Sequence, residues 1–183
     1  LIDVNSLLFR AYYGVCAGLS RADGRPTGAV YEFLTMILPI MATAKPDDMF
    51  VCVFDASRTT FRNDIYPQYK ANRSDTPEDL LLQMELTREA VRAMGMPVLC
   101  IPGVEADAVI ATLAKKYCTH ADATRVITSD KDLMQLVSYC VFLYDGMKEA
   151  EIRDQQVLEK FGVRPDQVID GQSLMGDSSD NVP

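Results

Sequence analysis

The run Val51-Cys52-Val53-Phe54-Asp55 decides the fold, because it is a short apolar segment with β-branched residues that ends in an acid. Similar short runs recur along the chain, and longer patterns typical of helices separate them. This alternation indicates an α/β domain with a mostly parallel central sheet covered by helices. We predict strands at residues 1–3, 49–54, 97–101, 125–128 and 140–144.

The predicted helices lie at residues 27–44, 77–94, 105–117, 132–138, 154–161 and 165–175. No internal repeat or low-complexity tract interrupts the pattern, so we predict one α/β domain over residues 1–183. Residues 57–75 are an exception, because they show neither the period of a strand nor that of a helix. Basic side chains outnumber acids there, and the segment is predicted to be a basic excursion between a strand and a helix.

The composition excludes several classes of protein. The chain has 183 residues, 48% hydrophobic and 24% charged, which is the balance of a globular domain rather than a disordered chain or a disulfide-stapled miniprotein. No apolar run reaches the roughly 18 residues of a membrane helix. The most apolar stretch, residues 33–44, contains Thr35, Pro39 and Thr43. We therefore expect no membrane association.

The cysteines and the histidine argue against two further kinds of site. The five cysteines are widely spaced, form no C-x-x-C motif and lie partly in apolar runs, so we expect buried thiols in a reducing compartment and no zinc site. They are Cys16, Cys52, Cys100, Cys118 and Cys140. His120 is the only histidine and lies in a polar stretch, which leaves little support for a histidine base or a histidine-ligated metal.

Acids stand repeatedly where a predicted strand ends, and two more follow the last predicted helix. They are Asp3, Asp55, Glu105, Asp107, Asp130, Asp132, Asp177 and Asp180. Carboxyl ends of parallel strands meet at one edge of a sheet, so we expect these side chains to converge. The net charge of −8 is unfavourable for a nucleic-acid enzyme unless metal ions neutralise these acids. Without them, the remaining 18 acids equal the 18 Lys and Arg residues.

Such a cluster favours hard divalent cations. Carboxylates that share one site repel each other unless a cation binds between them, and carboxylate oxygens select Mg²⁺ or Mn²⁺. Two ions roughly 3.5–4 Å apart activate a water and stabilise the leaving oxygen of a phosphodiester. Each acid taken alone is also explained as a helix cap, a turn residue or part of a solvated loop. The hypothesis therefore depends on their joint placement.

Six segments resemble the 5′-nuclease domain of bacterial DNA polymerase I, which belongs to the flap endonuclease family. They are L-I-D-V-N-S-L-L-F-R-A-Y-Y (1–13), V-F-D-A-S-R-T-T-F-R (53–62), Y-P-Q-Y-K-A-N-R (66–73), G-V-E-A-D-A-V-I-A-T-L-A (103–114), T-S-D-K-D-L-M-Q-L-V (128–137) and L-M-G-D-S-S-D-N-V-P (174–183). They stand in the family's order and span nearly the whole chain. Their combination is specific, whereas any one of them alone is weak.

The resemblance implies a PIN-like, three-layer α/β domain with two divalent ions, Mg²⁺ or Mn²⁺. It implies hydrolysis of phosphodiesters in 5′ flaps, nicked duplexes and RNA primers on DNA during replication and repair. It further implies polymerase domains in the same full-length chain, a monomeric state and a place in the bacterial cytoplasm, near the nucleoid.

The resemblance also implies roles for single residues. The ligands of the first metal would be Asp3, Asp55, Glu105 and Asp107. Those around the second would be Asp130, Asp132, Asp177 and Asp180. Lys70 resembles the active-site lysine at the base of a helical arch, here residues 57–95, and Arg73 a second phosphate contact. Tyr69 is a candidate for base stacking and Arg10 for a backbone contact. Arg58 and Arg62 either contact nucleic acid or belong to a solvated basic loop.

Three departures from the family pattern affect the expected function. Ala108 stands where bacterial members commonly have a further acid, whether naturally or by engineering, so we expect weakened or altered metal affinity. Val4 replaces the usual glycine beside Asp3 and is expected to crowd a backbone that passes the site. The chain ends before the helical hairpin with which the family grips duplex DNA.

Two alternatives to a nuclease remain at this point. The first is a module that binds branched nucleic acid but barely cleaves it, because Ala108 disables the metal site. The second is a small-molecule phosphohydrolase of the haloacid dehalogenase type. That class requires D-x-D at the first strand, whereas Asp3 is followed two positions later by Asn5. The second alternative is therefore the weakest.

Overall fold

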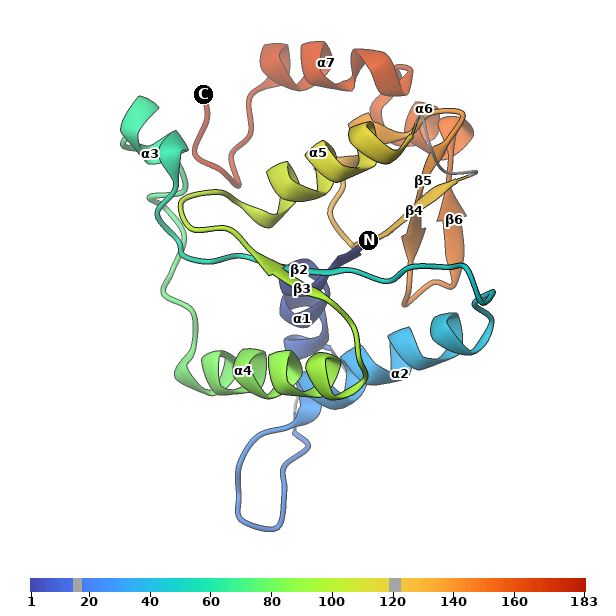
Figure 1. The fold of residues 1–183 in the computed structure, drawn as a ribbon. Helices are drawn as coiled ribbons and strands as arrows, with labels where there is room; N and C mark the ends of the chain where they lie inside the picture. Colours follow the sequence, from blue (N-terminus) through green and yellow to red (C-terminus); the bar gives the residue numbers. More distant parts are fainter. Residues whose placement is uncertain (15–17, 119–122) are drawn as a thin grey trace.

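One sheet organises the protein, and Figure 1 shows it in the computed structural model, which describes residues 1–14, 18–118 and 123–183. Within these residues the strand order is β3-β2-β1-β4-β5-β6. The strands are β1 (Ile2–Asp3), β2 (Cys52–Phe54), β3 (Val98–Cys100), β4 (Thr124–Ile127), β5 (Val141–Asp145) and β6 (Ala150–Ile152). All neighbours are parallel except β5 and β6. Each predicted strand is present, and β6 was not predicted.

The chain changes direction across the sheet at β1. Ile2 is in register with Cys52 of β2 on one side and with Ile127 of β4 on the other. The chain therefore extends the sheet first through β2 and β3, and then returns to extend it through β4 and β5. In open α/β sheets, ligands bind outside the carboxyl ends of the strands at such a reversal. Asp3, the last residue of β1, lies at this point.

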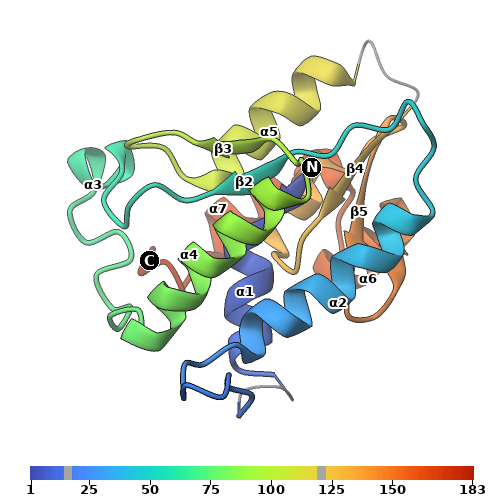
Figure 2. The same cartoon turned by 60° about the horizontal axis from the view of Figure 1, so that its bottom comes forward.

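Three helices cover one face of the sheet, as Figure 2 shows. They are α1 (Val4–Tyr12), α2 (Gly28–Ala42) and α4 (Glu78–Ala93). Alternate strand residues point into this core, including Cys52 and Phe54 of β2, which are almost completely buried. On the other face, Val53 packs in a second core.

The second face is covered by other helical segments. They are α5 (Ala106–Tyr117), η1 (Asp132–Leu136), α6 (Asp154–Phe161), η2 (Pro165–Gln167) and α7 (Val168–Met175). Ile110, Leu143 and Val157 are completely buried in this core. The predicted three-layer α/β architecture with a mostly parallel sheet is therefore confirmed. No helix in the described ranges combines the length and apolarity needed to cross a bilayer.

Some elements differ from the prediction. Helix α1 was not predicted, although Val4, Leu7, Leu8 and Ala11 are all buried and have helical spacing. Because Val4 points into the core, our expectation that it crowds the site is wrong. The 57–75 excursion contains a short helix, α3 (Phe61–Ile65). The predicted helix at 132–138 is the 3₁₀ segment η1, and the one at 165–175 divides into η2 and α7.

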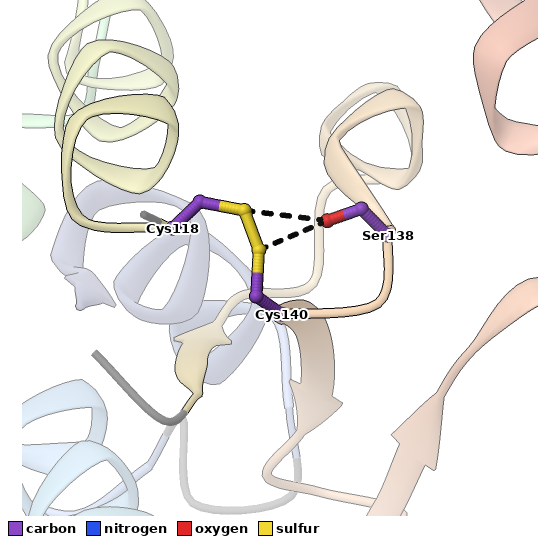
Figure 3. Close-up of a disulfide and its surroundings, with 3 residues drawn as sticks. All are labelled: Cys118, Ser138 and Cys140. Atoms are coloured by element: carbon purple, nitrogen blue, oxygen red, sulfur yellow. Dashed lines mark hydrogen bonds between the residues drawn. A yellow bond between two sulfur atoms is a disulfide. The ribbon is translucent and has the colours of Figure 1, made fainter. Parts of the chain in front are cut away.

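The cysteines correct another expectation. Cys118, just after α5, forms a disulfide with Cys140, just before β5, with Cα atoms 5.4 Å apart. The Ser138 hydroxyl lies beside both sulfurs (Figure 3). The prediction of free thiols is therefore wrong for this pair, since the fold joins residues 22 apart in sequence. Cys52 is free and buried, whereas Cys100 is free but exposed. Cys16 and His120 lie outside the described residues.

Candidate active site

A cleft of about 620 Å³ lies at the carboxyl ends of the central strands. Every acid predicted for the site except Asp177 lines it. These acids come from the end of β1, the residues after β2, the start of α5, the loop after β4 and the segment after α7. Lys70, Arg73 and Arg10 contribute positive charge to the same wall. The fold thus brings together side chains that are far apart in sequence.

Asp3 is the most deeply buried of these acids, with 5% of its surface exposed. It caps α1, where Oδ1 accepts the backbone N–H of Ser6 at 3.3 Å, and Oδ2 accepts the Thr128 hydroxyl at 2.7 Å. Burial raises the pKa of Asp3 to about 7, and the neighbouring Asp130 and Asp55 act in the same direction. The Thr128 hydroxyl opposes this shift by stabilising the carboxylate.

Asp55 joins the end of β2 to the start of α5. Its Oδ1 accepts the backbone N–H of Ala106, the first residue of α5, at 2.6 Å. Its own backbone N–H donates to Asn5 Oδ1 at 3.2 Å. Burial raises the pKa of Asp55, although the hydrogen bond from Ala106 works against that shift. Asp55 is therefore a helix cap as well as a cleft acid.

The loop after β4 supplies Asp130 and Asp132. Asp130 Oδ1 accepts the backbone N–H of Asp132 at 2.9 Å, and Asp132 Oδ1 accepts a hydrogen bond from Gln172 Nε2 of α7 at 2.5 Å. Burial raises the pKa of Asp130 and likewise that of Asp107. Gln172 was not predicted, because nothing in its local sequence indicates a contact 40 residues away.

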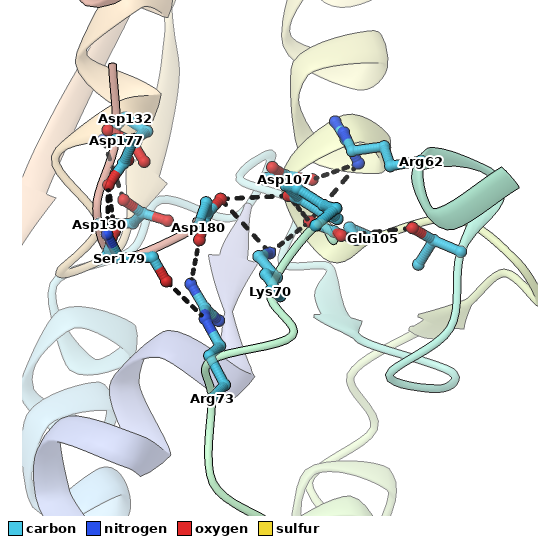
Figure 4. A network of polar contacts seen from close by, with 12 residues as sticks. Arg62, Lys70, Arg73, Glu105, Asp107, Asp130, Asp132, Asp177, Ser179 and Asp180 are labelled. Carbon is cyan, nitrogen blue, oxygen red and sulfur yellow. Dashed lines mark hydrogen bonds and ion pairs between the residues drawn. The ribbon is translucent and has the colours of Figure 1, made fainter. Parts of the chain in front are cut away.

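The basic excursion lies against the acids, as Figure 4 shows. Lys70 Nζ donates to Glu105 Oε2 at 2.7 Å and lies 3.8 Å from Asp180 Oδ2. Burial opposes ionisation of Glu105, but the hydrogen bond and charge of Lys70, with Arg62, hold its pKa below the usual range. Lys70 has φ 55°, a left-handed conformation that costs energy outside glycine.

The Tyr69 hydroxyl bridges two of these acids. It donates to Glu105 Oε2 and to Asp180 Oδ2, each at 3.1 Å. Burial and the nearby carboxylates raise the pKa of Tyr69. The hydroxyl of Tyr69 therefore lies inside the acidic cluster, and stacking of its ring on a base stays a prediction.

The segment after α7 completes the wall. Arg73 forms an ion pair with Asp180, and its Nε donates to the Ser179 carbonyl at 3.3 Å. Asp177 is not brought to the cleft lining. Its Oδ1 instead accepts hydrogen bonds from the backbone and hydroxyl of Ser179, at 2.8 and 2.5 Å. Those bonds lower the pKa of Asp177, the hydroxyl bond having the larger effect.

The other predicted arginines occupy three different settings. Arg10 lines the cleft and pairs with Asp145. Arg62 lies 3.5 Å from Glu105 and 3.8 Å from Asp107 and lines a smaller cavity. Arg58 is not part of the cleft lining. Its guanidinium donates hydrogen bonds to the Asp75 carboxylate and to the carbonyls of residues 73 and 74, within the same basic excursion. Its contact with nucleic acid stays a prediction.

The donor set suits hydrated divalent cations. Within residues 1–14, 18–118 and 123–183, no three Asp, Glu, His or Cys side chains form a closed metal cage. Mg²⁺ typically takes only one or two carboxylates and keeps several waters, so it does not require such a cage. The cleft acids raise one another's cost of ionisation, and a bound cation offsets that cost. The residues present therefore fit Mg²⁺ or Mn²⁺.

Comparisons with known proteins give the family. Residues 1–162 match the family model described as "5′-3′ exonuclease, N-terminal resolvase-like domain". The chain is 45% identical over 190 residues to a DNA polymerase I of Rhizobium leguminosarum, covering all of this chain and 19% of that protein. It is 35% identical over 183 residues to a 5′-3′ exonuclease of Buchnera aphidicola, covering all of this chain and 64% of that protein. The chain thus spans less than two thirds of either relative.

A solved structure supports the fold. The D15 flap endonuclease of bacteriophage T5, crystallised with DNA and metal ions as a pseudo-enzyme–product complex, superimposes with a TM-score of 0.73 at 21% identity. The superposition covers 98% of this chain and 66% of that one. Together with the sequence match over residues 1–162, this establishes that the chain belongs to the family of 5′-3′ exonuclease N-terminal, resolvase-like domains.

Proposed function

We propose that this domain is a divalent-metal-dependent 5′ nuclease that hydrolyses phosphodiesters in 5′-flap, nicked or primer-bearing DNA. The observation that supports this most strongly is the cleft, where acids from the ends of β1, β2 and β4, the start of α5 and the segment after α7 lie beside Lys70 and Arg73. A phosphodiester needs charge neutralisation and an in-line water, and it does not need a protein nucleophile. In this cleft, acids that can hold the metal ions and basic side chains that can neutralise a phosphate lie together.

The metal ligands are assigned by position in the cleft. Asp3, Asp55, Glu105 and Asp107 would hold one Mg²⁺ or Mn²⁺. Asp130, Asp132 and Asp180, with Asp177, would hold a second. When bound, such a pair of ions activates water and stabilises the leaving oxygen. Thr128, Gln172 and the Ala106 N–H orient individual carboxylates, as partners of metal ligands commonly do.

Lys70 and Arg73 would supply positive charge to the scissile phosphate. Both side chains line the cleft and contact Asp180 or Glu105, so their charges lie beside the proposed position of the scissile phosphate. A lysine supplies a compact positive charge, and an arginine can hold a phosphate through two hydrogen bonds. These charges stabilise the phosphate most where negative charge develops during hydrolysis.

The relatives suggest the wider setting of the domain. Their names describe DNA polymerases and 5′-3′ exonucleases, and both are longer than this chain. We therefore assign DNA as the partner, polymerase domains in the full-length protein, and action by a monomer in the bacterial cytoplasm. The T5 complex with DNA and metal ions has the same fold, which agrees with this assignment.

One observation favours the alternative of a binding module. Ala108 lines a cavity of about 100 Å³ together with Arg62, Asp107 and Asp132. Among the described side chains, Arg62 Nη1 is buried without a hydrogen-bond partner. A carboxylate at position 108 would supply an acceptor beside this cavity. The missing acid thus leaves a gap in the site and can weaken its affinity for metal.

Cleavage of a labelled 5′-flap duplex with Mg²⁺, with Mn²⁺ and with EDTA tests the proposal. The nuclease hypothesis expects product with either metal, no product in EDTA, and faster cleavage by the Ala108→Asp variant. The binding hypothesis expects retained binding without product, with cleavage only in Ala108→Asp. A protein that neither cleaves nor binds the flap, even with a helical hairpin supplied in the full-length chain, contradicts both.

A further inference from the structure

We propose that Asp145 is a positioning residue that holds Arg10 on the cleft wall, where the guanidinium meets a backbone phosphate of the bound DNA strand. The proposal rests on the proposed function and deepens it. Asp145 lies 135 residues from Arg10 and belongs to neither the acidic motifs nor the basic excursion.

Asp145 is itself fixed by the turn that follows β5. It is the last residue of that strand, and only 6% of its surface is exposed. Its Oδ1 accepts the backbone N–H groups of Met147 at 3.1 Å and of Lys148 at 3.2 Å. The other oxygen, Oδ2, accepts the hydrogen bond from Arg10 at 3.0 Å and lies 3.9 Å from Lys148 Nζ. The carboxylate therefore has a defined orientation before any ligand arrives.

Among the described residues, Arg10 makes its side-chain hydrogen bond to one partner. Its Nη1 donates to Asp145 Oδ2 at 3.0 Å, and its side chain is 30% exposed in the cleft. A guanidinium has five N–H donors, so most of them remain for a phosphate, which can accept two in parallel. Arg10 also lies in the last turn of α1, where the helix dipole favours a cation.

The acids of the cleft explain why Arg10 needs a partner of its own. Lys70 and Arg73, which also line the cleft, are drawn onto Glu105 and Asp180. A flexible arginine in the same cleft as Asp3 and Asp130 would be attracted in the same way. Asp145 offers a competing carboxylate at the edge of the cleft, which keeps Arg10 in place. Ordering the side chain in advance also reduces the entropy lost when DNA binds.

The plain alternative is that the pair only fastens α1 to β5. If the pair only fastens these elements, its loss should change the melting temperature and leave the affinity for DNA unaltered. The change should be small, because partly exposed ion pairs usually contribute little to stability. A positioning role appears instead in the affinity for DNA and in its salt dependence, because each phosphate contact releases counterions. A double-mutant cycle between the two residues separates these roles.

The test measures binding of a fluorescent 5′-flap duplex by anisotropy in Ca²⁺ at several salt concentrations. The variants are Asp145→Ala, Arg10→Ala, the double variant, Asp145→Asn and Lys148→Ala, the last of which removes the other cation beside Asp145 Oδ2. We expect Asp145→Ala to raise Kd about fivefold and to lower the salt slope by about one, as Arg10→Ala does. The double variant should be no weaker than Arg10→Ala. Asp145→Asn, which keeps the acceptor oxygen, and Lys148→Ala should stay within about twofold of wild type.

Other outcomes overturn the proposal. The proposal fails if Asp145→Ala weakens DNA binding as much in the Arg10→Ala protein as in the wild type. It also fails if Asp145→Ala shifts only the melting temperature. If Asp145→Ala does not fold, Asp145→Ser replaces it, because serine can still accept a turn N–H but cannot reach Arg10. Cleavage in Mg²⁺ is measured in parallel. A wild type that binds the flap without cleaving it contradicts the nuclease function alone, and one that does not bind contradicts both.

Discussion

Lys70 Nζ lies 2.7 Å from Glu105 Oε2, so a cation from the basic excursion reaches the acid that immediately precedes α5. The two residues are 35 positions apart, and both line the cleft. This contact places a positive charge beside the proposed metal ligands, and it makes residues 57–75 part of the site rather than a separate loop.

Lys70→Ala tests the catalytic part of that arrangement. The lysine charge is expected to act on the phosphate mainly as negative charge develops, so kcat should fall about 100-fold or more while the Kd for DNA changes by about threefold or less. Single-turnover cleavage and anisotropy measure the two quantities. Lys45→Ala is the matched control, since Lys45 is exposed and outside the cleft lining. Equal losses in rate and binding would show that Lys70 only tethers DNA.

Substitutions at Asp55 separate its two roles. Asp55→Asn removes a charge from a crowded, buried site but keeps an oxygen for the Ala106 N–H, so the metal-free protein should be as stable as wild type or more stable. Asp55→Ala also removes the cap of α5 and should cost about 1 kcal/mol relative to Asp55→Asn. Urea denaturation in EDTA measures both. If the two variants have the same stability, the cap has no energetic role. Cleavage should be lost in each.

Asp130 provides a second test of charge crowding. Burial raises its pKa, and Asp132 and Asp107 act in the same direction. Asp130→Asn should therefore abolish turnover while increasing the stability of the metal-free protein by up to about 1 kcal/mol. Thermal denaturation in EDTA checks the stability, and flap cleavage in Mg²⁺ checks the turnover. Unchanged cleavage would remove Asp130 from the site.

Tyr69 distinguishes stacking from hydrogen bonding. Its hydroxyl contacts Glu105 and Asp180, so Tyr69→Phe should weaken Mn²⁺ binding several-fold, because two acids lose a shared donor. Mn²⁺ titration followed by electron paramagnetic resonance measures this without DNA. If stacking were its main role, Tyr69→Phe would bind metal and DNA normally, and only Tyr69→Leu would lose DNA affinity.

The cysteines give a prediction independent of the site. Burial raises the pKa of Cys52 to about 12, so this thiol should resist iodoacetamide at pH 8 in the folded protein. Cys100 is exposed and should react within minutes, and Cys118 and Cys140 should react only after reduction. Mass spectrometry of digests before and after unfolding identifies each adduct. Rapid alkylation of Cys118 without reductant would contradict the disulfide.

The sequence predicted the layers of the fold well because the strands near the centre are short apolar runs, such as residues 49–54, separated by long helical patterns. It did not predict β6, since Ala150–Ile152 is a three-residue edge strand with two exposed residues and no distinctive period. Helix α1 was predictable from the spacing of Val4, Leu7, Leu8 and Ala11, but it follows β1 directly, with no linker to mark its start.

The candidate site, like the fold, was predictable only in part. The acids at strand ends were predictable because the parallel sheet brings carboxyl ends to one edge. Their partners were not, because Thr128, Gln172 and Asp145 contact the site through tertiary packing across 125, 40 and 135 residues. The Cys118–Cys140 disulfide was missed for the same reason, since spacing alone does not show which cysteines become neighbours.

The hydrogen bonds between the basic excursion and residues 178–181 have a consequence for biosynthesis. The Lys70 N–H donates to the Asp180 carbonyl, Asn72 to that of Ser178, and the Tyr66 hydroxyl to that of Asn181, over more than 100 residues in each case. On the ribosome, the earlier segment emerges long before these partners have been translated. One wall of the cleft therefore stays incomplete until the later residues leave the exit tunnel.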